Sequence, residues 1–406
     1  MGWLDDYNPI ANLSVAGTDV SNPSGVIVIV GPNSSGKTLL LEDIEHYFTT
    51  GELSKIVCSG LTPHHPGQPQ AIWEDLESRH YIRRIGPQPD AYTTYLSFLC
   101  GDKQPRQSRR KGRGENPQFN RKMFEEVVAS VSKAPEKNQF FQFVGSTLTG
   151  YLSLDVRRQI CSATQSFNHA ATIPTLPLQG LQLNSTAQET LAEETGRVFA
   201  NAVWLDISSH NQYQLRVSGK PTRPPVGDMI NPLRAGDYFS IEQEGDGFQS
   251  YVGICISILL GIRPVLLIDE PELCLHPPQA YNIGRFIGQH ALTKHATFVS
   301  THSSYVLRGI LETAKKVTVI RLTNRNRVFA ARLLPNEELR VAVRNPRSRA
   351  EAVLDGLFAK AVIVVESDGD REVYQAAGEN IAGFPSQEGC NRPDPANSRV
   401  IPVLAW

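Results

Sequence analysis

The chain has 406 residues, which at about 150 residues per domain leaves room for two or three domains. Its 40 basic and 41 acidic side chains give a net charge of −1, which excludes a protein that attracts nucleic acid or membrane over its whole surface. Six cysteines without C-x-x-C spacing argue against a zinc site or a disulfide framework and suit a reducing compartment.

The first residues, Met1 to Asp6, include acids where a signal peptide needs bases. The longest apolar candidate for a membrane span, Ile254 to Leu260, falls far short of the roughly 18 residues that a span needs. We therefore expect a cytoplasmic protein with no membrane partner.

A nucleotide-binding loop is indicated near the N-terminus. A β-rich opening over residues 11–30 ends in the apolar run 26–30, and a helical pattern then continues to about Phe48. The residues between them match the Walker A pattern G-x-x-x-x-G-K-[ST] in full, so backbone N–H groups are expected to cradle phosphate oxygens. The loop consists of Gly31, Pro32, Asn33, Ser34, Ser35, Gly36, Lys37 and Thr38.

Two side chains of this loop have expected roles toward ATP and Mg²⁺. Lys37 is predicted to reach the β and γ phosphates, and the Thr38 hydroxyl is predicted to hold the Mg²⁺ ion. The flanking strand and helix patterns are the context in which this motif binds nucleotides, so a chance Gly/Ser turn is disfavoured.

The stretch from about residue 52 to 235 reads as an inserted subdomain between two halves of one nucleotide-binding core. Its patterns predict helical or mixed structure first, then a helix and two short strands. In order, the segments are 119–133, 140–161, 186–202, 202–207 and 213–217.

The segment 102–122 is strongly basic and poor in apolar residues. Such a segment is typical of an arm that attracts nucleic acid phosphates without sequence preference. A merely solvated insertion explains the same composition equally well, so both interpretations stay open.

A second half of the ATP site is indicated between residues 265 and 302. The apolar run 265–268 reads as a buried strand and is followed by Asp269 and Glu270, as in a Walker B motif. Asp269 is expected to orient Mg²⁺, and Glu270 to polarise the attacking water as general base. The next strand ends at His302, which fits a sensor that contacts the γ-phosphate and Glu270.

A glycine-rich helix start precedes the Walker B strand. Residues 245–250 open the apolar helix 251–260, and glycines at a helix N-terminus present free N–H groups to an anion. Together with the Walker A loop, the D-E-P-E sequence at 269–272 followed by L-H-P at 275–277, and His302, this helix start resembles the ABC-type ATPases. Within that class the chain is similar to the OLD (overcoming lysogenisation defect) branch.

The resemblance implies that two copies of the chain sandwich ATP. The helix start of one copy then caps the γ-phosphate held by Lys37 of the other, with Asp246 where the wider class has its signature serine and Phe248 in place of the second glycine. The glutamine of the Q-loop, which this class of ATPases carries, has several candidates in this sequence and no single match. The capping residues are Gly245, Gly247, Gln249 and Ser250, and the Q-loop candidates are Gln68, Gln70 and Gln88.

The C-terminal stretch resembles the entry into a TOPRIM domain, whose first strand ends in E-G-x-x-D. Glu366 and Asp370 match it, Ser367 replaces the glycine, and Asp368 adds a carboxylate, so the resemblance implies Mg²⁺ bound by Glu366, Asp368 and Asp370. The later D-x-D pair has no counterpart before Trp406, so the chain is either a fragment of a longer protein or carries a degenerate module.

The expected fold is therefore α/β: an ABC-type P-loop ATPase domain over residues 1–345 with a helical or mixed insertion, followed by an incomplete TOPRIM-like domain over 346–406.

The resemblance implies an ATPase that controls a Mg²⁺-dependent DNA nuclease in bacterial defence against phage, with DNA, a second copy and a defence-system protein as partners. The alternative is an ATP-dependent sensor, scaffold or DNA-repair ATPase whose degenerate module acts through a partner effector. A transporter is disfavoured because L-S-G-G-Q is missing, and an SMC-like protein because no heptad run indicates a coiled coil.

Overall fold

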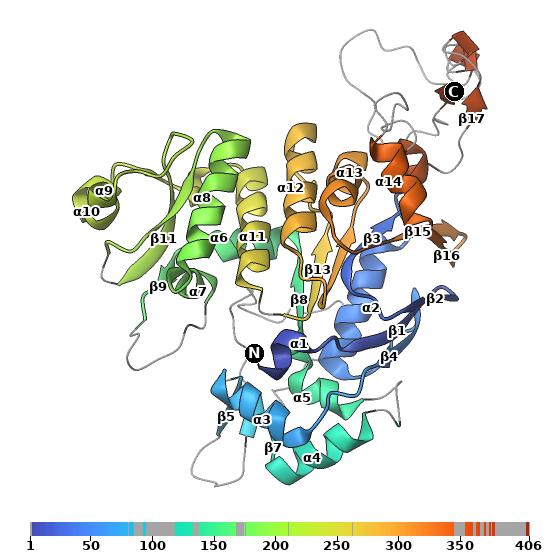
Figure 1. The fold of residues 1–406 in the computed structure, drawn as a ribbon, viewed down its shortest axis with the longest axis horizontal. Coiled ribbons are helices and arrows are strands. Elements are labelled where there is room, and N and C mark those ends of the chain that lie inside the picture. The colour runs from blue at the N-terminus through green and yellow to red at the C-terminus, as the bar shows by residue number, and fades with distance from the viewer. Residues whose placement is uncertain are drawn as a thin grey trace.

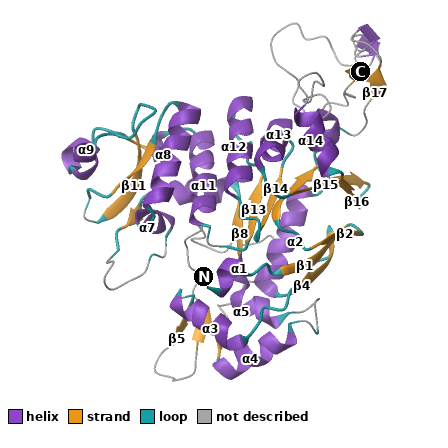
Figure 2. Cartoon of the chain, viewed as in Figure 1, coloured by secondary structure: helices purple, strands orange, loops and turns teal. Residues whose placement is uncertain are grey.

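The computed structural model places a six-stranded sheet at the centre of a mixed α/β fold, which confirms the predicted fold class (Figures 1 and 2). The residues that the structure describes are 2–79, 81–84, 92–94, 118–131, 133, 138–167, 174, 176–209, 211–261, 263–344, 354–359, 363–365, 369–370, 373–374, 376–377 and 403–405. Within these residues, no helix is both long and apolar enough to cross a membrane.

The central sheet is parallel except for one edge strand, β16, which pairs antiparallel with β15. The strand that precedes the Walker A loop, β3, lies between β14 and β15, and Val28 pairs with Val299 on one side and Val319 on the other. In spatial order the strands are β16 (Val328–Leu334), β15 (Val317–Arg325), β3 (Gly25–Val30), β14 (Ala296–Ser300), β13 (Val265–Asp269) and β8 (Thr149–Leu152).

Strand β3 separates two hydrophobic cores because its side chains alternate between the faces of the sheet. Val26, Val28 and Val30 face the core that holds α11, α12 and α13, whereas Ile27 and Ile29 face the core that holds α2 and α5. The helices are α2 (Lys37–Thr50), α5 (Gln139–Leu148), α11 (Asp246–Leu260), α12 (Pro277–His290) and α13 (Ser304–Thr313).

One strand of the central sheet comes from the stretch that reads as an insertion. The segment 140–161, expected to be helical or mixed, contains α5, then β8, then α6 (Leu154–Cys161). All four residues of β8 are buried, and they pair in parallel with Val265 to Ile268 of β13. So short a buried run has no readable periodicity, and only the pairing with β13 makes it a strand. Other expectations are confirmed, including the helix near 186–202 and the strands near 202–207 and 213–217.

The other described elements form smaller units around the sheet. One antiparallel sheet joins β1, β2 and β4 beside α2, another joins β9 to β12 in the lobe with α7 to α10, and a third joins β5, β6 and β7 near α3 and α4. Their bounds are α1 (Trp3–Asp6), β1 (Ile10–Val15), β2 (Thr18–Ser21), β4 (Cys58–Pro63), α3 (Pro69–Ser78), β5 (Ile82–Arg84), β6 (Tyr92–Thr94), β7 (Gln118–Phe119), α4 (Arg121–Ser130), β9 (Thr164–Gln165), α7 (Pro177–Gln182), α8 (Ser185–Phe199), β10 (Val203–Asp206), β11 (Gln212–Val217), α9 (Val226–Ile230), α10 (Pro232–Ala235), β12 (Phe239–Ser240), the 3₁₀ helix η2 (Ile241–Gln243) and α14 (Asn336–Arg344).

The described part of the C-terminal region contains the 3₁₀ helix η3 (Gly356–Phe358) and two paired strands. β17 (Ile363–Val365) and β18 (Val403–Ala405) are parallel neighbours. β17 ends directly before Glu366, where the sequence predicts the first strand of a TOPRIM-like domain, and that domain itself stays a prediction. Glu366 and Asp368 lie outside the described residues, as do residues 102–117 of the basic segment.

Helices α2 and α5 approach so closely that a side chain at Gly145 has no room. A Cβ atom there would overlap the carbonyl oxygen of Phe48. We expect Gly145→Ala to lower the free energy of unfolding by about 1–3 kcal/mol, because the two helices must move apart. Thermal or denaturant unfolding measures this. Gly227→Ala is the control, because a Cβ atom at Gly227 meets nothing within 4 Å; equal stabilities of the two variants would contradict the prediction.

Candidate functional site

The Walker A loop joins the end of β3 to the N-terminus of α2. Gly36 caps this helix with a φ of 99°, a conformation that L side chains rarely adopt, and a Cβ atom on it would also meet the ring of Phe329. The loop therefore requires glycine at this position, and it directs the free N–H groups of the first turn of α2 toward one place.

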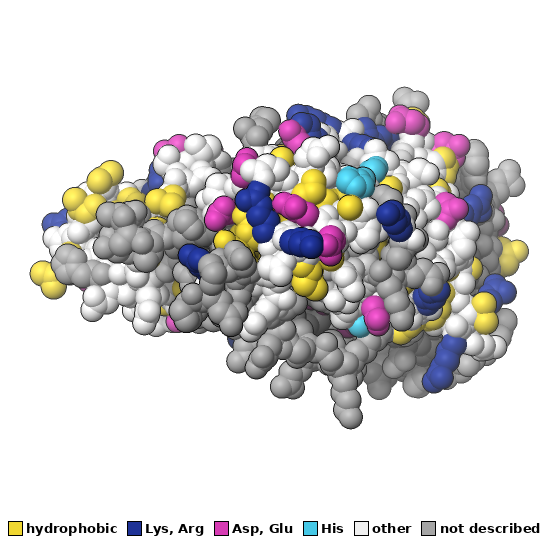
Figure 3. All heavy atoms as spheres, turned by 90° about the horizontal axis from the view of Figure 1, so that it is seen from below, with side chains coloured by type: hydrophobic (Ala, Val, Ile, Leu, Met, Phe, Trp, Pro, Cys, Tyr) yellow, Lys and Arg dark blue, Asp and Glu magenta, His cyan; other side chains and the backbone are white. Residues whose placement is uncertain are grey.

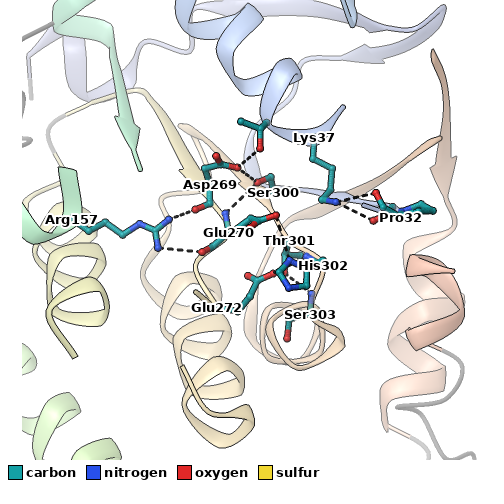
Figure 4. A network of polar contacts seen from close by, with 12 residues as sticks. Pro32, Lys37, Arg157, Asp269, Glu270, Glu272, Ser300, Thr301, His302 and Ser303 are labelled. Carbon is teal, nitrogen blue, oxygen red and sulfur yellow. Dashed lines mark hydrogen bonds and ion pairs between the residues drawn. The ribbon is translucent and has the colours of Figure 1, made fainter. Parts of the chain in front are cut away.

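Lys37 turns back over this loop (Figure 4). Its side chain is buried, and Nζ donates to the carbonyl oxygens of Gly31 at 3.1 Å and Pro32 at 3.3 Å. Burial lowers the pKa of the Lys37 ammonium, whereas the carboxylates of Glu270, Glu272 and Asp269 act in the opposite direction. The lysine therefore lies within a group of three carboxylates.

Asp269 joins the two halves of the predicted site. The Thr38 hydroxyl donates to Asp269 Oδ1 at 3.0 Å, and the Ser300 hydroxyl donates to the same oxygen at 2.5 Å. The other carboxylate oxygen, Oδ2, accepts from the Tyr151 hydroxyl at 2.9 Å. These groups converge because the strands are parallel, so that the carboxyl ends of β3, β14, β13 and β8 share one edge of the sheet.

The side chains expected to act on the attacking water also lie together (Figure 4). His302 Nδ1 is 3.4 Å from Glu270 Oε1 and 3.1 Å from Glu272 Oε1. Glu272 is buried, and its Oε1 accepts from the Thr301 hydroxyl and from the His302 backbone N–H, each at 2.7 Å. Its second oxygen, Oε2, is buried without a hydrogen-bond partner among the described residues.

The ionisation of these three groups follows from their contacts. The contact with His302 lowers the pKa of the Glu270 carboxyl, and the same contact raises the pKa of the His302 imidazole. Burial raises the pKa of the Glu272 carboxyl. Glu270 is therefore ionised at neutral pH, as a group that accepts a proton from water must be.

The start of α11 is more enclosed than the sequence pattern indicates. Gly245 is the N-cap, and the backbone at Gly247 passes beside the Cys274 carbonyl, where a Cβ atom would overlap it. The Gln249 amide donates to the Glu244 carbonyl at 2.8 Å, and the Ser250 side chain is fully buried. Both side chains thus make contacts inside their own subunit, and their expected capping role stays a prediction.

Arg157 is a buried residue of the site that no sequence motif marks. Its guanidinium donates to the backbone carbonyls of Asp269 and Glu270, to the latter at 3.2 Å (Figure 4). It also donates to the Ser250 hydroxyl at 2.9 Å. Burial lowers its pKa to about 10. Tyr151 and Ser300 are the other contributors that no motif marks, whereas Glu272 stands in the D-E-P-E sequence but had no expected role there.

Among the described residues, Tyr151 bonds to Asp269, and neither of the described Q-loop candidates, Gln68 and Gln70, does so. Gln68 is the N-cap of α3, and the Gln70 side chain bonds to Glu74 and Arg121. Gln88 lies outside the described residues. In this chain, the hydroxyl of a tyrosine on the neighbouring strand reaches Asp269.

The residues present fit Mg²⁺ and a nucleotide phosphate. Thr38 and Asp269 offer only oxygen donors, and Mg²⁺ in phosphate-transfer sites typically takes one or two carboxylates together with phosphate oxygens. Ser35 Oγ is buried in the loop without a hydrogen-bond partner among the described residues, so it has a bond to offer an entering group.

The second predicted metal site is not assembled in the described part of the chain. Asp370 is exposed, and no group of three or more His, Cys, Asp or Glu side chains that could hold a metal ion occurs among the described residues. Glu366 and Asp368 lie outside them, so this site stays a prediction.

A protein-family model described as "AAA domain, putative AbiEii toxin, Type IV TA system" matches residues 65–308. No curated protein matches the sequence. Among solved structures, an SMC head bound to the C-winged helix domain of ScpA has a TM-score of 0.41 and 13% identity, covering 81% of this chain and 98% of its own. The SMC head domain from Thermotoga maritima has a TM-score of 0.38 and 14% identity, covering 80% of this chain and 97% of its own.

Proposed function

The chain belongs to the AAA-domain family described for AbiEii-type toxins of type IV toxin–antitoxin systems, and we propose that it hydrolyses ATP between two copies of itself and thereby controls a nuclease. That it is a P-loop ATPase of the AAA/ABC type follows from the family. The finer assignment to the OLD branch, the Mg²⁺ dependence and the nuclease are parts of the proposal.

One observation carries the ATPase proposal: Thr38 of the Walker A loop donates a hydrogen bond to Asp269 of the Walker B strand at 3.0 Å. Two motifs 231 positions apart in the sequence therefore form one site. Thr38 and Asp269 would hold Mg²⁺, which when bound neutralises charge on the phosphate oxygens. Lys37 would exchange the Gly31 and Pro32 carbonyls for phosphate oxygens.

Glu270 is the group best placed to accept the proton of the attacking water. It is ionised because His302 lies beside it, and its side chain is partly exposed toward the site. His302 Nδ1 lies 3.4 Å from this carboxylate, and His302 contacts the γ-phosphate in this proposal. Glu272 supports His302, because its Oε1 bonds to the His302 backbone N–H.

A second copy of the chain would complete the site. Asp246 begins α11 with its side chain half exposed, and no atom lies within 4 Å of a Cβ atom built on Gly245, so the N-terminus of this helix is accessible. Accessible N–H groups at a helix N-terminus favour an anion such as the γ-phosphate bound by the other copy. Gly245, Gly247, Gln249 and Ser250 are the proposed capping residues, Ser250 through its backbone alone because its side chain is fully buried against Arg157. Residues 1–345 would form the ATPase domain and 346–406 the start of a TOPRIM-like one.

Cleavage of DNA is the most specific part of the proposal and rests on the E-x-x-x-D motif of Glu366 and Asp370. We expect Glu366→Ala and Asp370→Ala to leave ATP turnover within about twofold, while Mg²⁺-dependent cleavage of phage or plasmid DNA falls by at least about a hundredfold. The control is Asp355→Ala, at an exposed acid outside the motif. Cleavage that persists in both motif variants would contradict a TOPRIM nuclease in this chain.

An ATP-dependent sensor or scaffold acting through a partner effector is the second candidate, and exposed apolar side chains on the lobe with α9 and α10 favour it. Val226 is 70% exposed, Ile230 62% and Leu233 85%, and Figure 3 shows hydrophobic side chains gathered at that end of the molecule. Contiguous exposed apolar surface is typical of sites that bind proteins. DNA that stays intact in the presence of the unmodified chain and Mg²⁺-ATP would favour this candidate over the nuclease.

A further inference from the structure

The guanidinium of Arg157 is fully buried, and among the described residues its hydrogen bonds go to backbone carbonyls and one hydroxyl, not to a carboxylate side chain. Its Nε donates to the Leu152 carbonyl at 3.1 Å, and its two terminal nitrogens donate to Ser250 and to the Asp269 and Glu270 carbonyls. A planar fork of five donors suits this task, because it bonds several acceptors in fixed directions at once. Arg157 therefore connects three elements: β8, the start of α11 and the end of β13.

Helix α6, which carries Arg157, is held tightly against α11. A Cβ atom on Gly253 would overlap the Arg157 carbonyl, so the backbones of the two helices touch at this point. One turn further along α6, the Cys161 thiol donates to the Gln249 carbonyl at 3.2 Å. A displacement of the first turns of α11 must therefore move α6, since close-packed helices transmit shifts and do not absorb them.

Arg157 also bonds to the backbone of Glu270, whose conformation sets the direction of the Glu270 side chain. Glu270 has a φ of 48°, in the left-handed region that non-glycine residues rarely adopt. Its N–H donates to the Ser300 carbonyl at 2.9 Å, and its C=O accepts from Arg157 at 3.2 Å. Such a conformation persists only where its surroundings hold it, and here Ser300 and Arg157 hold the two sides of the residue.

We propose that Arg157 is a positioning residue that couples the start of helix α11 to the Glu270 backbone, so that engagement of α11 by the nucleotide of a second copy sets the direction of the general base. The inference rests on the proposed ATP-dependent pairing of two copies. Arg157 itself touches no nucleotide in this account. It acts through the two carbonyls at the end of β13 and through Ser250.

A second buried arginine supplies a matched control. Arg263 is also buried and also donates to backbone carbonyls, to Ser146 at 2.6 Å and to Thr149. It lies at the opposite end of β8, because Thr149 begins the strand that Leu152 ends. Arg263→Lys therefore removes a comparable buried guanidinium at the other end of β8. It leaves the contacts between α11 and Glu270 unchanged.

The test compares steady-state ATP hydrolysis of Arg157→Lys, Ser250→Ala, the double variant and Arg263→Lys, with thermal unfolding of each. Lysine keeps the charge but has too few donors for the four acceptors of Arg157 and does not hold them in fixed directions. We therefore expect kcat of Arg157→Lys to fall about tenfold or more, with KM for ATP within about twofold. Ser250→Ala should lower kcat in the same way. The double variant should be no slower than Arg157→Lys alone, because both substitutions break one connection. Arg263→Lys should keep kcat.

Three results would overturn the inference: wild-type kcat in a folded Arg157→Lys variant, independent and multiplicative effects of the Arg157 and Ser250 substitutions, or an equal loss of kcat in Arg263→Lys. Should Arg157→Lys fail to fold, Ser250→Ala decides alone, since it leaves the arginine in place and must still lower kcat.

A second measurement separates this inference from the proposed function. Light scattering with Mg²⁺-ATP should show that Ser250→Ala still forms dimers; an unmodified chain that neither pairs nor hydrolyses ATP would refute the proposed function itself.

Discussion

Glu270→Gln is expected to lower kcat for ATP hydrolysis by about 10²- to 10⁴-fold, the usual contribution of a general base. Glutamine has nearly the shape of glutamate but cannot accept the proton of water. The native carboxylate is suited to that task because the contact with His302 lowers its pKa and keeps it ionised at neutral pH. The amide should leave ATP binding intact, since Lys37 and Thr38 are unchanged.

The same variant should accumulate a dimer with ATP bound, because the sandwich closes and hydrolysis no longer opens it. Single-turnover hydrolysis and light scattering with ATP measure the two effects. Glu312→Gln is a suitable control, since Glu312 pairs with Arg308 and Tyr281 away from the site. Turnover of Glu270→Gln within a few-fold of the unmodified chain would remove Glu270 from the role of base.

Lys37→Ala is expected to weaken ATP binding by about 30-fold or more, because removing one partner of a buried charge pair costs about 2–5 kcal/mol. The lysine is enclosed by its own loop, and its hydrogen bonds within the described residues go to Gly31 and Pro32 of that loop. Thermal unfolding without ATP should therefore change little.

Equilibrium binding of a fluorescent ATP analogue measures the effect of Lys37→Ala. Lys294→Ala is the control, because Lys294 is an exposed lysine that pairs with Asp6. Equal affinities of the two variants for the analogue would mean that the Walker A loop does not hold the nucleotide as proposed.

The Walker A loop and the Walker B strand can both be recognised in the sequence, because each is a short continuous stretch. The Walker A loop shows its strand, its glycines and its helix within a short stretch, and the Walker B strand shows an apolar run followed by Asp269 and Glu270. The pattern could therefore predict that Thr38, Asp269, Glu270 and His302 share one edge of the sheet, and the structure brings them together there.

The rest of the site depends on strand order, which no local pattern records. Tyr151 reaches Asp269 only because β8 pairs with β13, and β8 is a four-residue buried run inside a stretch that reads as an insertion. Arg157 follows that strand in a helix with an unremarkable pattern. Glu272 stands in the recognised D-E-P-E sequence, but its burial against Thr301 and His302 becomes visible only when β13 and β14 are neighbours.

Phosphate release from Mg²⁺-ATP over a range of protein concentrations tests most directly whether a second copy completes the ATPase site. Turnover per subunit should rise with protein concentration until every copy is paired, and it should disappear in Lys37→Ala. A rate per subunit that is constant across the whole range, or one that survives in Lys37→Ala, would contradict the account.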